Sequence, residues 1–378
     1  MGAGSVISIL YLFCILQTSI SADDRLTTLV KTIASTIVNK SHSHYCPYIE
    51  IGTAIERIKK AGSGDPDVLV HTPCFALDSF GNKWSNYLEA RICANITGLH
   101  YAGVSMQWGN IVNDNFLATV PSIVYNPKKH RVPPSQLHSS CPCHTMCHEK
   151  ANGLMHQHPD MVRDMFLPTI DRHLSVMPPV RLGSAWRKTI RRNVSSTGGP
   201  TPWPAIPDIA VHYRCGDNTV GPYGFLPFTA IRNRIKSSLA AGEHPDTLYV
   251  MAEPAGRKTK PRQVSRCNVI LDELHRYLTR HFPVTTVLTL RGLSLYDDLV
   301  RLTKAKVTIC SVSTFCLFPA MAASHPVYFP VSSLVAESTN PVYGPHFHWM
   351  NRADERIVSG VKSLQMELKT LIQHLGGQ

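Results

Sequence analysis

Three side chains that could bind or orient an anion stand at the end of the apolar run 208–213, in the stretch His212-Tyr-Arg214-Cys-Gly216-Asp217. An arginine at the end of a strand can direct a bidentate cation at a phosphate group. Gly216 would let the backbone turn away from the strand, and Asp217 would hold that turn or orient Arg214. The alternative is an ordinary strand-end arginine that pairs with Asp217.

A hydroxyl-rich turn follows a second apolar run, 306–310, and reads Ser311-Val-Ser313-Thr314-Phe315. Hydroxyls and backbone N–H groups at the N-terminus of a helix bind anions. The alternative is simple N-capping by Ser313 or Thr314. In a parallel sheet this turn and Arg214 would face the same crevice. Two phosphate-binding groups that face the same crevice would suit the two phosphates of a pyrophosphate.

Two adjacent acids open the helix expected before this second run, in Ser294-Leu-Tyr-Asp297-Asp298. One acid can cap the helix, which leaves the other free to accept a hydrogen bond from a base or a sugar. The alternative is that both acids compensate the helix dipole.

The elements that must position these groups alternate between strand and helix patterns in the second half of the chain. Repeated βα units predict a parallel sheet with helices on both faces, and ligands bind at the carboxyl ends of its strands. Strands are expected at 208–213, 247–252, 284–290 and 306–310. Helices are expected near 228–241, 262–281, 295–305 and 314–323.

The first half has a less regular pattern. A strand is expected from Asp67, a helix near 84–96, and partial helix within 161–192. The Pro- and Gly-rich stretch 193–207 predicts a linker. We therefore expect a leader or signal anchor (1–22), a stem (23–66), an N-terminal domain (67–192), the linker (193–207) and a C-terminal domain (208–378).

The N-terminus predicts the compartment. An apolar run, Val6 to Leu16, interrupted by Ser8, is followed by small residues at Ser19 and Ser21, as in a secretory leader. The alternative is an uncleaved signal anchor through residues 6–20. Either places the chain in the Golgi or ER lumen or outside the cell. Ten cysteines lie beyond the leader, and in an oxidising compartment this even number suggests disulfides.

Composition narrows the possible classes of protein. The 378 residues carry 38 Lys and Arg against 26 Asp and Glu, a formal charge of +12 that favours anionic ligands. Charged residues make up 17%, which argues against a disordered polyelectrolyte. A polytopic membrane protein is excluded, because no apolar run reaches the ~18–20 residues of a membrane span.

The motifs carry a resemblance. The HxRxGD pattern at 212–217 is similar to the signature of GDP-fucose-dependent fucosyltransferases of the α1,2-, α1,6- and protein O-fucosyltransferase superfamily. The stretch 298–315 resembles the later motif of this superfamily. Residues 81–91 with Thr97-Gly98-Leu99 resemble its early Gly-Asn loop and helix. In contrast to the common pattern, position 215 is Cys rather than Arg, and Lys83 follows the Gly-Asn pair.

The resemblance implies a GT-B-like α/β fold, with two Rossmann-like domains that face a cleft. It implies transfer of fucose from GDP-fucose, with inversion, to a glycan or glycoprotein acceptor, without a metal or other cofactor. Arg214 would contact the β-phosphate as the catalytic residue, and Asp298 would contact guanine or ribose. The other implied site residues are His212, Gly216, Asp217, Ser311, Ser313, Thr314 and Phe315 on the donor side and Gly81 and Asn82 on the acceptor side.

Other signals favour less specific interpretations. The cluster Cys141-Pro-Cys143-His144-Thr-Met-Cys147-His148 has zinc-like spacing, but disulfides are the preferred interpretation in a secreted chain. His346 and His348 could lie on one strand face, and a surface loop after Pro345 is preferred. The basic stretch 181–192 predicts a solvated helix face or an acidic-glycan contact rather than a nucleic-acid site.

Two other functions remain open. The chain could be a glycan- or nucleotide-binding protein that keeps the fold without catalysis, with Cys215 as the suggestive feature. It could also be a disulfide-rich secreted hydrolase, although neither GxSxG nor HExxH occurs.

Overall fold

The chain divides into two compact units, residues 1–165 and 166–378. The computed structural model describes residues 69–72, 84, 87, 88, 91, 92, 95, 100–105, 124–125, 154–180, 203–215, 223–240, 242–252, 261–291, 294–332, 343–359, 362–363 and 366–376. The leader, the stem and most of the expected linker lie outside these residues, and the predicted domain boundaries stay predictions. No helix among the described residues is both long and apolar enough to cross a bilayer.

The first unit contains a small parallel sheet. Its strands are β1 (Leu69–Thr72), β2 (His100–Ser105) and β3 (Val124–Tyr125), paired in that order. The expected helix after β1 is present at all its described positions, and Trp84, Leu88 and Ile92 are buried at helical spacing. The short helix α6 (Leu154–Gln157) follows, and α7 (Pro159–Leu174) spans the division between the units.

The second unit is built on a six-stranded sheet in which every paired neighbour is parallel. The strands in spatial order are β10 (Phe347–Met350), β9 (Val327–Pro330), β8 (Val307–Ile309), β4 (Ile209–His212), β6 (Thr247–Ala252) and β7 (Thr286–Arg291). The four predicted strands are confirmed as β4, β6, β7 and β8. The α/β class is therefore confirmed, with a parallel sheet in each unit, as in a GT-B-like chain.

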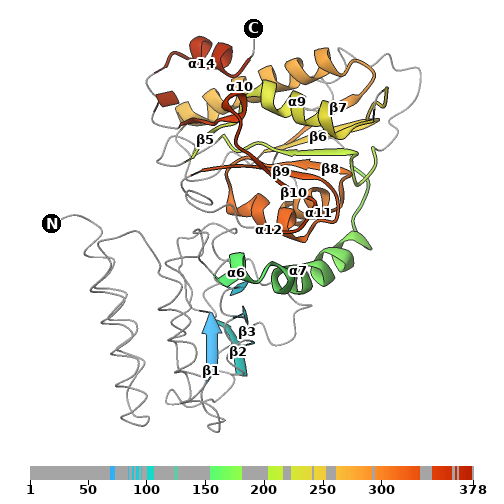
Figure 1. Ribbon diagram of the computed structural model, residues 1–378, viewed down its shortest axis with the longest axis vertical. Helices are drawn as coiled ribbons and strands as arrows, with labels where there is room; N and C mark the ends of the chain where they lie inside the picture. Colours follow the sequence, from blue (N-terminus) through green and yellow to red (C-terminus); the bar gives the residue numbers. More distant parts are fainter. Residues whose placement is uncertain are drawn as a thin grey trace, which may run out of the picture. The chain divides into compact units, whose positions relative to one another are not determined.

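Helices cover both faces of this sheet (Figure 1). One face carries α9 (Phe228–Ser238), α10 (Pro261–His281) and α14 (Leu368–His374), and the other carries α11 (Leu295–Lys304) and α12 (Thr314–Ala322). The four predicted helices are confirmed as α9 to α12. The main apolar core lies between the sheet and the first of these faces, where Val211 and Val250 are fully buried together with Leu274 of α10.

The segment after Pro345 corrects a prediction. The preferred interpretation was a surface loop, but Phe347–Met350 forms β10 and pairs with β9 in register, Phe347 opposite Val327. Aromatic side chains stabilise this edge of the sheet: the ring centroids of Phe347 and Trp349 lie 5.0 Å apart. The surface-loop interpretation is wrong because this packing gives the edge strand its own apolar contacts.

The order of the strands defines a point where the chain reverses direction across the sheet. From β4 the chain proceeds to β6 and β7 on one side, and then returns to β8, β9 and β10 on the other. The reversal lies between β4 and β8. In open parallel sheets such a reversal leaves a crevice at the carboxyl ends of the two strands, where ligands bind.

A two-stranded ribbon lies beside this sheet. β5 (Gly224–Phe225) pairs antiparallel with β11 (Val358–Ser359), which follows the 3-10 helix η3 (Ala353–Glu355). The ribbon joins the segment that follows β4 to the segment that follows η3.

Candidate functional site

The ends of β4 and β8 are joined by hydrogen bonds. The backbone N–H of Arg214 donates to Ser311 Oγ over 3.2 Å. The backbone N–H of Ser311 in turn donates to the carbonyl oxygen of His212 over 3.0 Å. The strand-end arginine and the hydroxyl-rich turn therefore meet at the reversal point of the sheet.

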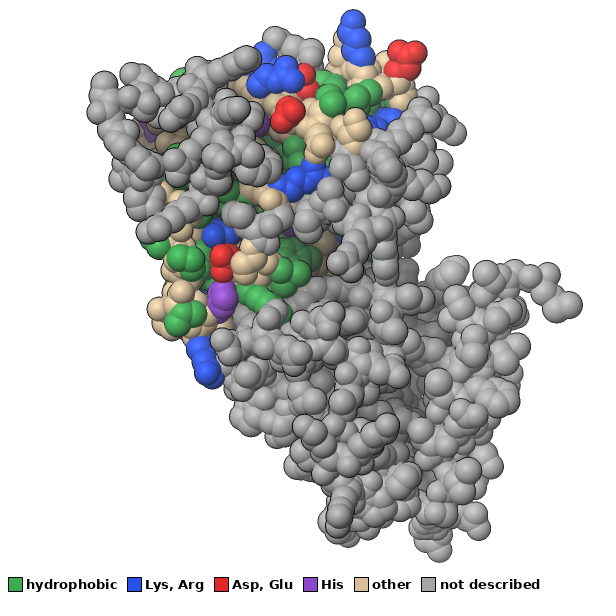
Figure 2. Space-filling view, turned by 180° about the vertical axis from the view of Figure 1, so that it is seen from behind, with side chains coloured by type: hydrophobic (Ala, Val, Ile, Leu, Met, Phe, Trp, Pro, Cys, Tyr) green, Lys and Arg blue, Asp and Glu red, His purple; other side chains and the backbone are tan. Residues whose placement is uncertain are grey.

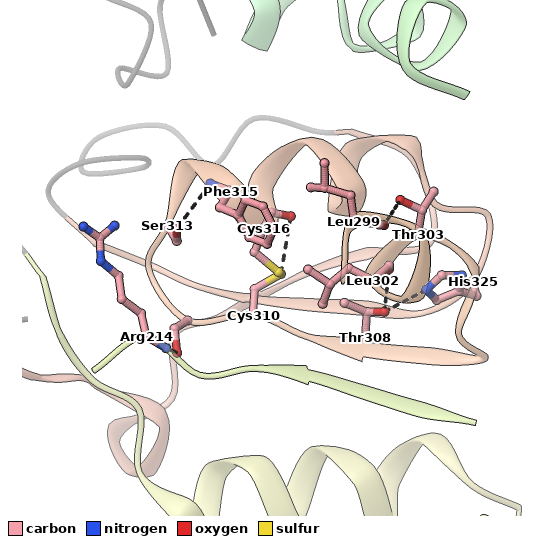
Figure 3. Close-up of a disulfide and its surroundings, with 11 residues drawn as sticks. Arg214, Leu299, Leu302, Thr303, Thr308, Cys310, Ser313, Phe315, Cys316 and His325 are labelled. Carbon is pink, nitrogen blue, oxygen red and sulfur yellow. Dashed lines mark hydrogen bonds between the residues drawn. A yellow bond between two sulfur atoms is a disulfide. The ribbon is translucent and has the colours of Figure 1, made fainter. Parts of the chain in front are cut away.

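The Arg214 side chain is partly exposed and stacks on an aromatic ring. Its guanidinium carbon lies 3.8 Å from the centroid of the Tyr223 ring, which is well within cation–π distance. Figure 3 shows the side chain extending on the same side of the strand ends as Ser313. Arg214 is thus restrained at the end of β4 by its backbone hydrogen bond and by the ring against its guanidinium.

The turn after β8 presents the N-terminus of α12. Ser313 is the N-cap, and its Oγ accepts a hydrogen bond from the backbone N–H of Phe315 over 3.2 Å (Figure 3). The N-capping alternative is therefore correct for Ser313. Ser311, Ser313 and Thr314 are all buried. The backbone N–H groups of this first turn carry the positive end of the helix dipole, which favours an anion.

Two disulfides lie just beyond the ends of β4 and β8. Cys310 and Cys316 are bonded across the hydroxyl-rich turn, with Cα atoms 5.8 Å apart (Figure 3). Cys215, next to Arg214, is bonded to Cys267 of α10. The expectation of disulfides is confirmed for these two pairs. The cysteine that replaces an arginine of the resembled motif therefore forms a buried covalent link to a helix.

His212 is a buried, neutral imidazole at the last position of β4. Burial, together with the nearby Arg214 charge, lowers its pKa to about 3. Its ring centroid lies 5.5 Å from that of Phe315. Its Nδ1 has no hydrogen-bond partner among the described residues. His212 therefore adds a polar group to this edge without adding charge.

Asp298 lies in a separate charged cluster on α11. Its Oδ1 accepts a hydrogen bond from Arg301 over 2.8 Å, and both side chains are buried. Burial raises the pKa of Asp298 to about 7, although Arg301 opposes this shift. The neighbouring Asp297 carboxylate lies 2.7 Å from His173 Nε2 of α7. The helix itself is N-capped by Ser294, which accepts from the Asp297 N–H over 3.4 Å.

Several predicted site residues lie outside the described part of the chain. These are Gly81, Asn82, Gly216 and Asp217, as well as the cluster 141–148. Among the described residues, no group of three or more His, Cys, Asp or Glu side chains could hold a metal ion. Basic side chains do not gather in one patch on the face in Figure 2; among the described residues they lie scattered between acidic, apolar and polar ones.

Sequence reasoning missed the stack of Tyr223 on Arg214 and both disulfide pairings. It also missed Arg301, which lies in a predicted helix and neutralises its acids. The spacing Cys310-x5-Cys316 across a predicted strand–turn–helix was a usable signal for one disulfide, because a bridge requires Cα atoms within about 7 Å. The pairings of Tyr223 with Arg214 and of Cys215 with Cys267 had no local signal.

Comparison with known proteins gives only distant similarity. No family model and no curated protein matches the sequence. The chain is similar to the solved structure of E. coli heptosyltransferase WaaC with ADP-2-deoxy-2-fluoro heptose (12% identity, 79% of this chain and 98% of that one, TM-score 0.31). It is also similar to E. coli ADP-heptose LPS heptosyltransferase II (10%, 85% and 81%, TM-score 0.28) and to POFUT1 in complex with GDP (14%, 72% and 78%, TM-score 0.22). Similarity at this level establishes neither a family nor an activity for this chain.

Proposed function

We propose that this protein is a glycosyltransferase that transfers fucose from GDP-fucose, with inversion, to a glycan or glycoprotein acceptor. The observation that carries the proposal is the hydrogen bond between Arg214 N–H and Ser311 Oγ. It brings a guanidinium and a helix N-terminus together at the reversal point of a parallel sheet. Both are groups that bind phosphate, and their convergence suits the diphosphate of a nucleotide sugar.

The chemistry requires stabilisation of the leaving group. As the bond between the sugar and the diphosphate breaks, negative charge grows on the oxygen of the β-phosphate. Arg214 would neutralise this charge as the catalytic residue, and the N–H groups at the start of α12 would donate to the other phosphate oxygens. Ser311, Ser313 and Thr314 would line the phosphate site, and Phe315 would pack beside it. None of these groups requires a metal.

Other residues would define the rest of the donor site. The neutral imidazole of His212 can donate one hydrogen bond to the donor, because its low pKa keeps it uncharged at neutral pH. Asp298 would contact the base or ribose in the proposed role, with Gly216 and Asp217 on the phosphate side. Gly81 and Asn82 would contribute to the acceptor side.

We place this reaction in the secretory pathway, either in the Golgi or ER lumen or outside the cell. Two disulfides within the described residues support an oxidising compartment. The apolar run at residues 6–16 would direct the chain there as a cleaved leader or as an anchor.

A thermal-shift panel of nucleotide sugars tests the proposal on the full chain. GDP and GDP-fucose at 100 times their dissociation constant should stabilise the protein by about 2.7 kcal/mol. ADP-, UDP- and CMP-sugars should stabilise it less. A parallel assay measures donor hydrolysis and transfer to glycoprotein glycans. Indifference to every nucleotide sugar would refute the proposal, and selective GDP binding without turnover would support the non-catalytic binding protein instead.

A further inference from the structure

We propose that Tyr223 is a positioning residue for Arg214, which fixes the plane of the guanidinium before the donor binds. The inference rests on the proposed function, because it assigns Arg214 to the diphosphate. It adds a residue that has no role in that proposal and that follows Arg214 by nine positions.

The contact geometry is that of a stacked pair. The guanidinium carbon of Arg214 lies 3.8 Å from the centroid of the Tyr223 ring. A guanidinium is planar, and its N–H groups can donate to two oxygens of one phosphate; a ring against one face limits the directions in which that plane can turn. The Arg214 backbone is fixed independently, through its N–H bond to Ser311 Oγ. The residue is thus restrained at both ends, at its backbone by Ser311 and at its guanidinium by the Tyr223 ring.

Tyr223 is itself held by the ribbon that follows it. The next residue, Gly224, pairs with Ser359, and Phe225 pairs with Val358. A Cβ atom at Gly224 would collide with the backbone carbonyl of Val358, so glycine is needed for this close approach. The position of Tyr223 is therefore set by β11, which is far from it in sequence.

The same segment is tied to the strand that carries Arg214. The hydroxyl of Tyr213 donates to the carbonyl oxygen of Leu226 over 3.1 Å, and both residues are buried. Tyr213 is the residue before Arg214, and Leu226 lies three residues after Tyr223. This hydrogen bond therefore ties the segment that carries the Tyr223 ring to the strand end that carries the Arg214 guanidinium.

The stack has a physical advantage for binding and for turnover. A free arginine side chain has about 2 kcal/mol of rotamer entropy to lose when it is fixed. Stacking on Tyr223 removes part of this freedom in advance. The diphosphate then meets an arginine in its binding conformation, and the same orientation is kept when charge grows on the leaving oxygen.

The test compares Tyr223→Phe with Tyr223→Leu in the full chain, by calorimetric titration of GDP and of guanosine. Phenylalanine keeps the aromatic face, and leucine fills part of the volume without it. We expect Tyr223→Phe to bind GDP within about twofold of wild type. Tyr223→Leu should weaken GDP binding roughly threefold to thirtyfold, the range of cation–π pairs. Guanosine affinity should be the same in all three proteins, because guanosine lacks phosphates.

A double-mutant cycle with Arg214→Ala completes the test. In the Arg214→Ala background, Tyr223→Leu should have no further effect on GDP affinity, since its effect acts through the arginine. Equal losses in both backgrounds, or equal losses of GDP and guanosine affinity, would overturn the positioning role. If wild type binds GDP and Tyr223→Leu binds it equally well, the positioning role of Tyr223 is refuted and the proposed function is unaffected. If wild type does not bind GDP, the proposed function fails with it.

Discussion

Two arginines in the second unit have opposite surroundings. Arg301 on α11 is buried and surrounded by acceptors: its guanidinium donates to Asp298 over 2.8 Å, lies 3.7 Å from Asp297, and donates to the Ala205 carbonyl over 3.2 Å. Arg214 is partly exposed, and its guanidinium stacks on the Tyr223 ring while its backbone is bonded to Ser311. Arg301 pairs with the buried Asp298 and the half-buried Asp297, whereas Arg214 is proposed to bind an anionic ligand.

The difference shows how the same side chain can serve structure or function. The Arg301 cluster also joins segments that are distant in sequence, because Ala205 precedes β4 and Asp297 contacts His173 of α7. Loss of its cation would leave buried carboxylates without compensation. Loss of the Arg214 cation would remove the positive charge of the proposed anion site and leave the packing of the core intact. Substitutions at the two positions should therefore separate stability from activity.

Arg301→Ala should produce the largest loss of stability. The substitution removes the partner of the buried Asp298 carboxylate, and breaking a buried ion pair in this way costs about 3–5 kcal/mol. Chemical denaturation at pH 7.5 measures the free energy of unfolding. The control is Arg301→Leu combined with Asp298→Leu, which should recover part of the loss because the pair is replaced by apolar groups. Unchanged stability of Arg301→Ala would contradict the structural role.

Arg214→Ala should show the reverse pattern. Transfer should fall ~100–1000-fold, as for the loss of one electrostatic contact to a leaving group, and the free energy of unfolding should change by less than about 1 kcal/mol. Donor turnover and denaturation are measured on the same preparation. The matched control is Arg172→Ala, an exposed arginine of α7, which should leave both unchanged. Normal transfer by Arg214→Ala would refute its catalytic assignment.

The sequence predicted the strands and helices that carry Arg214 and Arg301 better than it predicted the contacts of these two side chains. Strands β4, β6, β7 and β8 are short runs rich in apolar and β-branched residues and each is followed by a helix, so the local pattern identifies them. β10 was missed because His348 is exposed within it and Pro345 precedes it. In such a short edge strand, pairing with β9 outweighs the local pattern.

The site was predictable in part for a similar reason. The rule that functional groups follow parallel strands brought Arg214 and Ser311 together before any contact was known. It could not identify Tyr223, because that ring reaches Arg214 through the pairing of β5 with β11. It also could not identify the partner of Asp298, because Arg301 lies one helical turn later and the same spacing occurs on many exposed helices.

Loss of the Cys310–Cys316 disulfide, which crosses the hydroxyl-rich turn, should have a smaller effect on both stability and donor binding. In the chain-entropy view, a bridge over a loop as short as that between Cys310 and Cys316 contributes about 2 kcal/mol of stability. Cys310→Ser with Cys316→Ser should lose roughly this amount. GDP affinity should fall while guanosine affinity is kept, because the bridge restrains the turn that would bind phosphate. Equal loss of both affinities would indicate general disruption of the unit.

The last expected effect is the pH dependence of the Arg301 cluster. Burial raises the pKa of Asp298 from 3.8 to about 7 in the folded protein, whereas the unfolded chain has the ordinary value. Between these values the folded state binds a proton that the unfolded state has released. The contribution of Asp298 is therefore fully present below about pH 4 and is lost as the pH rises through about 7.

Asp298→Asn isolates this contribution from other titrating groups, including the neighbouring His173 and Asp297. The free energy of unfolding of wild type minus that of the variant should fall as the pH rises from 4.5 to 7.5, by at most about 1.4 kcal/mol per pH unit. Denaturant titrations at half-unit intervals measure the difference. A difference that rises with pH would mean that Arg301 outweighs burial and holds Asp298 ionised. In that case Asp298 would be a fixed anion in the cluster, and its proposed contact with the donor would use its second oxygen as a charged acceptor throughout this pH range.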